Sequence, residues 1–156
     1  MTTKAKLTLS ERMARIRKVD TTPELMVRRL AHKLGYRFRL HCRDLPGVPD
    51  LVFPGLRKVI FVHGCFWHRH TCRDGQKLPV SKPDYWGPKF ARNVERDRQH
   101  LAAIEQLGWK VLVLWECELR HERKLQRALI RFLGRRRPTR KAPTIGSRLP
   151  PAPQGP

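Results

Sequence analysis

One short stretch of the sequence constrains the fold more than any other, because it joins a buried strand to a dense group of reactive side chains. The apolar run at 59–62 predicts a buried strand. Residues 61–72, which overlap its end, contain two cysteines, three histidines and two adjacent aromatic residues. Free thiols and imidazoles gather in this way chiefly around metal ions. The sequence therefore predicts a metal site held rigidly at the end of a strand.

The balance of charge indicates the kind of partner. The chain has 156 residues, 40% of them hydrophobic, which suits one domain with a substantial core. Its net charge is +21. Residues 1–19 carry six Lys or Arg and one acid, and residues 134–156 carry six and none, so the middle of the chain is basic in its own right. A basic domain favours a polyanionic partner, nucleic acid before an anionic membrane.

Three features predict a cytoplasmic protein with no membrane partner. No apolar run approaches the roughly 20 residues of a membrane-spanning helix. The N-terminus lacks the apolar core of a signal peptide. The four cysteines are then expected as thiols or metal ligands in a reducing compartment, and not as a disulfide framework.

The chain is predicted to divide into three segments. Residues 1–19 are polar and basic, and are expected to form either a disordered start or an arm that lies along phosphates. Residues 20–134 are expected to form the folded domain. Residues 135–156 are rich in Pro and Arg without an apolar pattern, which predicts a disordered basic tail.

The folded segment is predicted to begin with a helix. Thr22-Pro23-Glu24 is typical of a helix start, with Thr22 as N-cap, and Gly35 is expected to end the helix. Locally, Glu24 is explained by the helix dipole and by a capping box with Thr21. The predicted apolar stripe comprises Met26, Val27, Leu30, Ala31 and Leu34.

Three strands are predicted next, at residues 36–41, 48–53 and 57–62. The first alternates apolar and basic residues, which indicates one inward and one cationic face. A turn at Pro54-Gly55 makes the second and third strands a hairpin. Such a hairpin brings Asp50 beside Val62 and His63, where hard oxygen ligands for Mg²⁺ meet a base for water.

The second half of the folded segment is predicted as loop, helix, strand and helix. Residues 73–89 are expected to be a loop that carries Trp86, which either is exposed and could stack on or wedge between bases or covers the edge of the core. The predicted helix at 89–107 has Asp97 on its apolar stripe and Asn93 one turn earlier, so we expect Asp97 to be paired or near a metal. A mostly apolar strand at 109–115, expected to be central, and a helix at 122–133 follow.

Three cysteines and one further ligand would form a closed structural zinc site. The cysteines are Cys65, Cys72 and Cys117, which follows the strand at 109–115. Spacing does not choose the fourth ligand, for which the candidates are His68, His70 and Cys42. The zinc would join the loop to the last strand and stiffen the segment that carries the adjacent aromatic residues.

Four segments resemble the very short patch repair (Vsr) family of DNA mismatch endonucleases. They are LPGVPD at 45–50, VIFVHGCFWH at 59–68, NVERDR at 93–98 and LGWKVLVLWEC at 107–117. The resemblance covers roughly residues 10–133, in order and with the spacing of the family. One departure is Val62, where threonine is usual in the family. A metal ligand provided by the backbone carbonyl would be unaffected, whereas a needed hydroxyl would be lost.

The resemblance implies a fold and a reaction. The fold would be restriction-endonuclease-like, an α/β arrangement with a mixed central β-sheet flanked by α-helices and a structural Zn²⁺ site. The reaction would be Mg²⁺-dependent phosphodiester hydrolysis that nicks one strand 5′ of the thymine in a T:G mismatch left by deamination of 5-methylcytosine. The partner would be double-stranded DNA bearing that mismatch, with mismatch-repair proteins as further candidates, and the enzyme would act as a monomer.

The resemblance also implies roles for individual residues. Asp50 matches the magnesium-binding aspartate, with the Val62 carbonyl as a second ligand. His68 matches the water-activating histidine, which leaves His70 to the zinc with Cys65, Cys72 and Cys117. The positions that hold metal-bound water or orient the site are matched by Glu24, His63, Asn93 and Asp97. The aromatic wedge beside the mismatch is matched by Phe66, Trp67 and Trp86.

Two other functions remain open from the residues alone. In one, the chain is a zinc-stapled DNA-binding module without catalysis, and Asp50 and the histidines are structural. In the other, it is a restriction-like endonuclease that cuts both strands of matched duplex.

Overall fold

The computed structural model describes residues 19–80 and 82–135. The helices and strands, in chain order, are α2 (Thr22–Lys33), β1 (Leu51–Phe53), β2 (Lys58–His63), α3 (Arg73–Gln76), α4 (Pro83–Gln106), β3 (Lys110–Trp115) and α5 (Glu122–Leu133). Short 3-10 helices at Pro54–Leu56 and Glu116–Arg120 follow β1 and β3. Apart from Val19 and Arg135, the predicted arm and tail lie outside the described residues.

The strands form a mixed three-stranded sheet in the order β1-β2-β3. β1 pairs antiparallel with β2, with Leu51 opposite Ile60, which confirms the predicted hairpin. β2 and β3 are parallel, with His63 opposite Trp115 at their carboxyl ends. The central strand is therefore β2, and the expectation that β3 is central is wrong for the described part of the chain.

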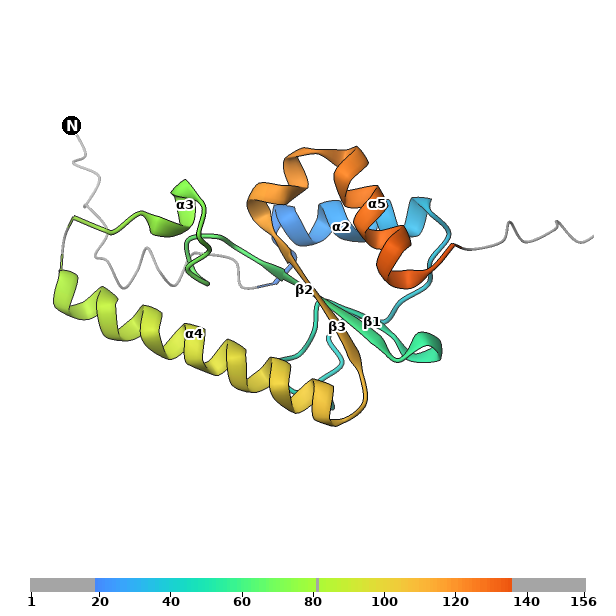
Figure 1. The fold of residues 1–156 in the computed structure, drawn as a ribbon, viewed down its shortest axis with the longest axis horizontal. Coiled ribbons are helices and arrows are strands. Elements are labelled where there is room, and N and C mark those ends of the chain that lie inside the picture. The colour runs from blue at the N-terminus through green and yellow to red at the C-terminus, as the bar shows by residue number, and fades with distance from the viewer. Residues whose placement is uncertain (1–18, 81, 136–156) are drawn as a thin grey trace, which may run out of the picture.

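Helices cover both faces of this sheet (Figure 1). α2 and α5 lie together on one face and α4 runs along the other. Alternate strand residues point into each layer, so that Ile60 and Val62 pack under α2 and α5 while Val59 and Phe61 pack with Ile104 of α4. A strand buried on both faces is apolar at every position, which explains the run at 59–62.

The predicted helix at the start of the folded segment is present, with two differences. Its N-cap is Thr21, since the Thr21 hydroxyl accepts from the amide of Glu24 at 3.5 Å. Met26 is 40% exposed, whereas Glu24 and Arg28 are buried. The buried face of α2 is therefore rotated toward two charged residues, which a search for apolar spacing does not find.

The strand predicted at 36–41 is wrong. This segment makes a single bridge to β1, between Arg39 and Val52. Tyr36 and Phe38 do turn inward as the alternation indicates, but they pack edge-on against Phe53, with ring centroids 6.4 and 5.9 Å away. Ring packing and one pair of backbone hydrogen bonds, between Arg39 and Val52, therefore hold this segment in place of a continuous ladder.

The loop predicted at 73–89 is also wrong over most of its length. α3 occupies its start, and α4 begins at Pro83, so that Pro88 lies inside the helix. Proline disfavours a helix interior, but Trp86 and Phe90 are 4% and 5% exposed and anchor this end of α4 to the protein. Tertiary packing outweighs the local signal, and Trp86 is buried, which agrees with the second of the two placements predicted for it.

The last helix gives a stability prediction. Leu129 of α5 is 0% exposed in the core between α2, α5 and the sheet. Leu129→Ala is expected to lower the free energy of unfolding by about 2–5 kcal/mol, because it leaves a cavity. Urea denaturation measures this loss, and the exposed Arg127→Ala is the control, expected within about 0.5 kcal/mol of the parent. A loss in the leucine variant as small as that of the control would contradict this packing.

No helix in the described residues is both long and apolar enough to cross a membrane.

Candidate active site and metal centre

Two groups of side chains lie at the carboxyl ends of β2 and β3. Because these strands are parallel, the segments that follow them leave the sheet at the same edge. Cys65 and Cys117 each stand two residues beyond the last pair of the register, His63 and Trp115. This register is the reason why a cysteine far along the chain reaches the loop after β2.

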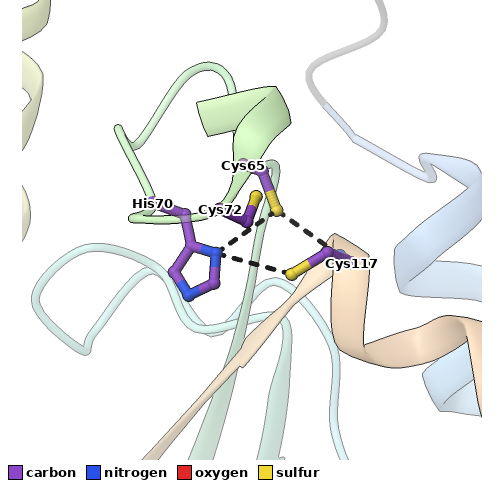
Figure 2. A group of neighbouring side chains, drawn as sticks. All are labelled: Cys65, His70, Cys72 and Cys117. Atoms are coloured by element: carbon purple, nitrogen blue, oxygen red, sulfur yellow. Dashed lines mark hydrogen bonds between the residues drawn. The ribbon is translucent and has the colours of Figure 1, made fainter. Parts of the chain in front are cut away.

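The first group comprises Cys65, His70, Cys72 and Cys117 (Figure 2). Their ligand atoms all lie within 4.8 Å of one another. The Nδ1 atom of His70 is 3.4 Å from the Cys117 sulfur and 3.9 Å from the Cys65 sulfur. A tetrahedral zinc site, with Zn–S near 2.3 Å and Zn–N near 2.0 Å, has S···N edges of about 3.5 Å. The donor set and its spacing therefore fit a tetrahedral metal ion.

The surroundings of these four residues favour a bound cation. Burial raises the pKa of the Cys65 thiol to about 12, so a positive charge is needed to keep it as a thiolate. The hydrogen bond with His70 lowers the pKa of Cys72 to about 6. The His70 ring stacks on Trp115 with centroids 4.3 Å apart, which fixes the orientation of this ligand. The Cys117 amide donates to the Cys65 sulfur at 3.4 Å.

The structure separates the three candidates for the fourth ligand. His70 is in the cluster, as the resemblance implies. His68 belongs to the second group, and Cys42 lies apart, with its sulfur 4.0 Å from the carbonyl of Leu40.

The second group begins with Asp50, just before β1. Its Oδ2 accepts from the amide of Val62 at 2.6 Å, which confirms the predicted closeness of these residues. The structure describes no hydrogen bond to the other oxygen, Oδ1, from residues 19–80 or 82–135. Burial raises the Asp50 pKa to about 6, against the opposing effect of the Val62 amide, and the charge of Glu24 raises it further. Asp50 is thus a half-buried hard oxygen donor with one free oxygen, which suits a divalent cation.

His63 follows Val62, which Asp50 contacts, and forms a group with His68 and Asp97. The rings of His63 and His68 stack with centroids 3.9 Å apart and planes 7° apart. Nδ1 of His68 is 2.5 Å from Oδ2 of Asp97, so the acid on the apolar stripe of α4 is paired, as expected. Burial favours a higher pKa for Asp97, but the hydrogen bond and charge of His68 outweigh it, and the Asp97 pKa lies below its usual value.

The histidine pair suits proton transfer better than metal binding. Burial, helped by the charge of His68, lowers the His63 pKa to about 4, so His63 is neutral at pH 7. Imidazole lone pairs lie in the ring plane, and two parallel stacked rings cannot both direct them at one ion. With Nδ1 of His68 donating to Asp97, its Nε2 is left to accept a proton.

Two further predicted site residues make contacts of another kind. Asn93 of α4 donates to the carbonyl of Trp67 at 3.4 Å, which ties the loop after β2 to α4. Glu24 accepts from the hydroxyl of Thr21 and from the amide of Asp20, both at 2.9 Å, and so caps α2. Its charge also acts on Asp50, so Glu24 belongs to both the cap and the site.

The aromatic residues form one cluster between the loop and α4. Phe66 contacts Trp67, Trp86 and Phe90, with ring centroids 5.0, 6.0 and 5.2 Å away. Phe66 and Trp67 are half-buried, whereas Trp86 is buried and stacks on Phe90. The Lys89 ammonium lies 5.1 to 5.9 Å from the ring centroids of Tyr85, Trp86 and Trp67. The cluster therefore combines apolar rings with a cation.

Three residues at the site were missed from the sequence: Arg28, Lys89 and Phe90. Arg28 stands four residues after Glu24, a spacing that places two side chains on one helix face. Lys89 and Phe90 stand three and four residues after Trp86, so the same spacing would have found them once α4 was known to begin at Pro83.

A mixed-sheet α/β fold that carries a carboxylate, an imidazole pair and a cysteine–histidine cluster has the groups that metal-assisted hydrolysis uses. Residues 1–74 match the family model of the DNA mismatch endonuclease Vsr. The type II nicking enzyme V.XorIIP of Xanthomonas oryzae pv. oryzae is 57% identical over 107 residues, which are 69% of this chain and 78% of that protein.

Two other relatives agree with this match. The DNA mismatch endonuclease Vsr of Escherichia coli K12 is 43% identical over 120 residues, or 77% of this chain and 76% of that protein. The type II nicking enzyme V.NmeAIP of Neisseria meningitidis is 39% identical over 110 residues, or 70% and 78%. The chain belongs to the Vsr family of DNA mismatch endonucleases.

Proposed function

We propose that the protein nicks one strand of double-stranded DNA, 5′ of the thymine in a T:G mismatch, by Mg²⁺-dependent hydrolysis. The observation that carries this proposal is that Asp50 contacts Val62, directly before His63 of the His63–His68–Asp97 group, in a member of the Vsr family. Hydrolysis of a phosphodiester uses a carboxylate that binds a cation and an oriented imidazole that accepts a proton from water.

Asp50 and the Val62 carbonyl would hold the magnesium. Bound there, Mg²⁺ would stabilise the negative charge that develops on the scissile phosphate. Oδ1 of Asp50 is the oxygen left for this role, because Oδ2 already accepts from the Val62 amide. The observed contact of Val62 is through its amide, and the ligand role of its carbonyl stays a prediction. A backbone ligand would make the replacement of threonine by valine harmless.

His68 is proposed to accept the proton of the attacking water at Nε2. The carboxylate of Asp97 holds the ring by Nδ1 and would stabilise the imidazolium that forms. The stacked ring of His63 confines His68 on one face. Glu24 and Asn93 are proposed to orient the site, Glu24 through its effect on Asp50 and Asn93 by holding the loop.

The pairing of His68 with Asp97 gives a kinetic prediction. Asp97→Asn is expected to lower the single-turnover rate of nicking by about 10²-fold, because the amide cannot stabilise the imidazolium. The dissociation constant for mismatched DNA, measured without Mg²⁺, is expected to stay within about twofold of the parent. Glu95→Gln, which removes an exposed acid of the same helix, is the control. A variant that nicks at the parent rate would contradict the role of Asp97.

Cys65, His70, Cys72 and Cys117 are proposed to bind structural Zn²⁺. Four protein ligands close the coordination sphere and leave no position for a substrate, as in structural sites. The metal would fasten the loop that carries His68 and the aromatic pair to the end of β3. It would thereby hold the catalytic imidazole against α4.

Phe66 and Trp67 are proposed to insert beside the mismatch. They are half-buried and stand on the loop next to His68, so insertion would place the scissile strand near the imidazole. A T:G wobble pair is cheaper to unstack than a matched pair. The family resemblance implies that Trp86 inserts as well. Trp86 is buried against Phe90, however, and would have to leave this packing. We therefore propose that it supports Phe66, which its ring contacts.

Substrate choice is tested with T:G duplexes whose flanking bases are randomised. The proposal predicts that the nicked products are enriched in some flanking sequences and always carry the break 5′ of the mismatched thymine. Breaks placed without regard to the mismatch would overturn it.

A further inference from the structure

Arg28 is a buried arginine on α2 whose charge has no role in the function proposed above. It is 9% exposed. One guanidinium nitrogen donates to Oε2 of Glu24 at 3.0 Å and the other donates to Oδ1 of Asp20. The planar fork thus connects two carboxylates, one in the first turn of the helix and one just before it.

Packing alone does not explain an arginine at this position. Its neighbours Val27 and Ala31 are 0% exposed and belong to the core. A buried ion pair contributes little net stability compared with apolar side chains of similar volume. Moreover, Nε of Arg28 is buried with no partner among the residues that the structure describes, and an unpaired buried donor is destabilising. A methionine at this position would stabilise the core at least as well as the arginine does.

Arg28 is connected to the active site through Glu24, which the function proposed above uses to orient that site. The guanidinium donates to Oε2 of Glu24 at 3.0 Å, and both side chains are buried. Arg28 is the cation that pairs with Glu24. It also donates to the carboxylate of Asp20, and the Asp20 amide donates to Glu24. These contacts hold the backbone where the chain enters α2.

We propose that Arg28 is a positioning residue of the endonuclease, which acts by holding the carboxylate of Glu24 in the one orientation in which it serves the site. Without the guanidinium, the Glu24 carboxylate keeps the neutral donors of Thr21 and Asp20 but loses its charged donor. Arg28 itself is buried and does not reach DNA. Its loss therefore lowers the rate of the chemical step and leaves the binding of DNA unchanged. This inference rests on the proposed nicking reaction.

The first test compares Arg28→Met with Arg29→Met, in single-turnover nicking of a T:G duplex with Mg²⁺. Arg29 is the next residue on α2, is exposed and carries the same charge, so it is a matched control. Arg28→Met is expected to lose about 10- to 100-fold in rate, because small misplacements of catalytic groups cost this much. Its dissociation constant for the duplex without Mg²⁺ is expected to stay within about twofold, and Arg29→Met is expected to keep the parent rate within about twofold. Nicking by Arg28→Met at the rate of the control overturns the inference.

The second test asks whether Arg28 acts through Glu24. The variants are Glu24→Gln, Arg28→Met and the two combined. If Arg28 only orients Glu24, the double variant nicks at the rate of Glu24→Gln alone, and its melting temperature without metal falls no further than that of the worse single variant. If the rate losses of the two single variants multiply in the double variant and their falls in melting temperature add, Arg28 acts independently of Glu24. That result overturns the inference.

Two further outcomes are decisive. If Arg28→Met is unfolded at the assay temperature, Arg28→Lys replaces it. Lysine keeps the charge, but its single ammonium cannot donate to two carboxylates in the geometry of the planar guanidinium. We therefore expect a loss in nicking rate with a near-parental melting temperature. A lysine variant that nicks like the parent overturns the inference. If the parent itself does not nick T:G duplex with Mg²⁺, the proposed function fails, which is a different result from an active parent with an equally active Arg28→Met.

Discussion

Asp50→Ala is expected to abolish strand nicking, with a loss of at least about 10³-fold in the single-turnover rate with Mg²⁺. A metal ion contributes several kcal/mol to charge stabilisation in the transition state, and about 1.4 kcal/mol corresponds to tenfold in rate. Asp50 is the one proposed magnesium ligand that is a side chain, so its removal loses this contribution. Burial is the main cause of its raised pKa, because it disfavours the ionised carboxylate. Carboxylates with perturbed pKa values are typical of functional sites.

The matched control for Asp50 is Asp44→Ala. Asp44 lies on the same connecting segment but is exposed, so the variant is expected to nick at the parent rate. Asp50→Ala should still bind mismatched DNA, because the basic surface and the aromatic pair are intact. If Asp50→Ala nicks like the parent, the proposed mechanism is wrong. If neither the parent nor any variant nicks but all bind, the chain is a binding module.

Cys117→Ser is expected to lose tightly bound zinc and at least about 10 °C in melting temperature. Cys117 connects the end of β3 to the loop after β2, and a structural zinc contributes directly to folding. In a domain of this size each kcal/mol corresponds to roughly 2–8 °C, so a loss of a few kcal/mol reaches this figure. Metal analysis of the purified protein and thermal melting measure the two effects.

Cys42→Ser is the matched control for the zinc site. Its thiol lies outside the four-residue cluster, so zinc content and melting temperature are expected to be unchanged. Nicking by Cys117→Ser is also expected to fall, because the zinc loop carries His68. Full zinc content in Cys117→Ser would contradict this ligand set, and loss of zinc from Cys42→Ser would indicate a different one.

The parts of the fold that were predicted well carry strong local patterns. The helix at 122–133 is found with the same bounds, since its apolar period is regular and Gly134 ends it. The hairpin of β1 and β2 follows from two apolar runs around a turn, and it places Asp50 on Val62. The cysteines could be grouped from their chemistry alone. The choice of His70 over His68 came from the family resemblance, and the structure brings His70 into the cluster.

The parts that were missed depend on contacts between distant residues. Trp86 was predicted in a loop because Gly87 and Pro88 follow it, but its packing against Phe66 carries the helix through the proline. Arg28 was not predicted as a site residue, because its burial depends on Asp20 and Glu24, which share its guanidinium. Spacing along the chain records which residues share a helix face, and it does not record which face the rest of the protein covers.

The central claim is strand-specific nicking at a T:G mismatch, and one assay tests it most directly. A duplex with a single T:G mismatch and its T:A counterpart are each labelled on one strand or the other and incubated with the full chain, with Mg²⁺ or with a chelator. The account predicts one product, a break 5′ of the thymine on the thymine strand of the mismatched duplex, formed only with Mg²⁺. Breaks in both strands, or equal cutting of the matched duplex, would contradict it.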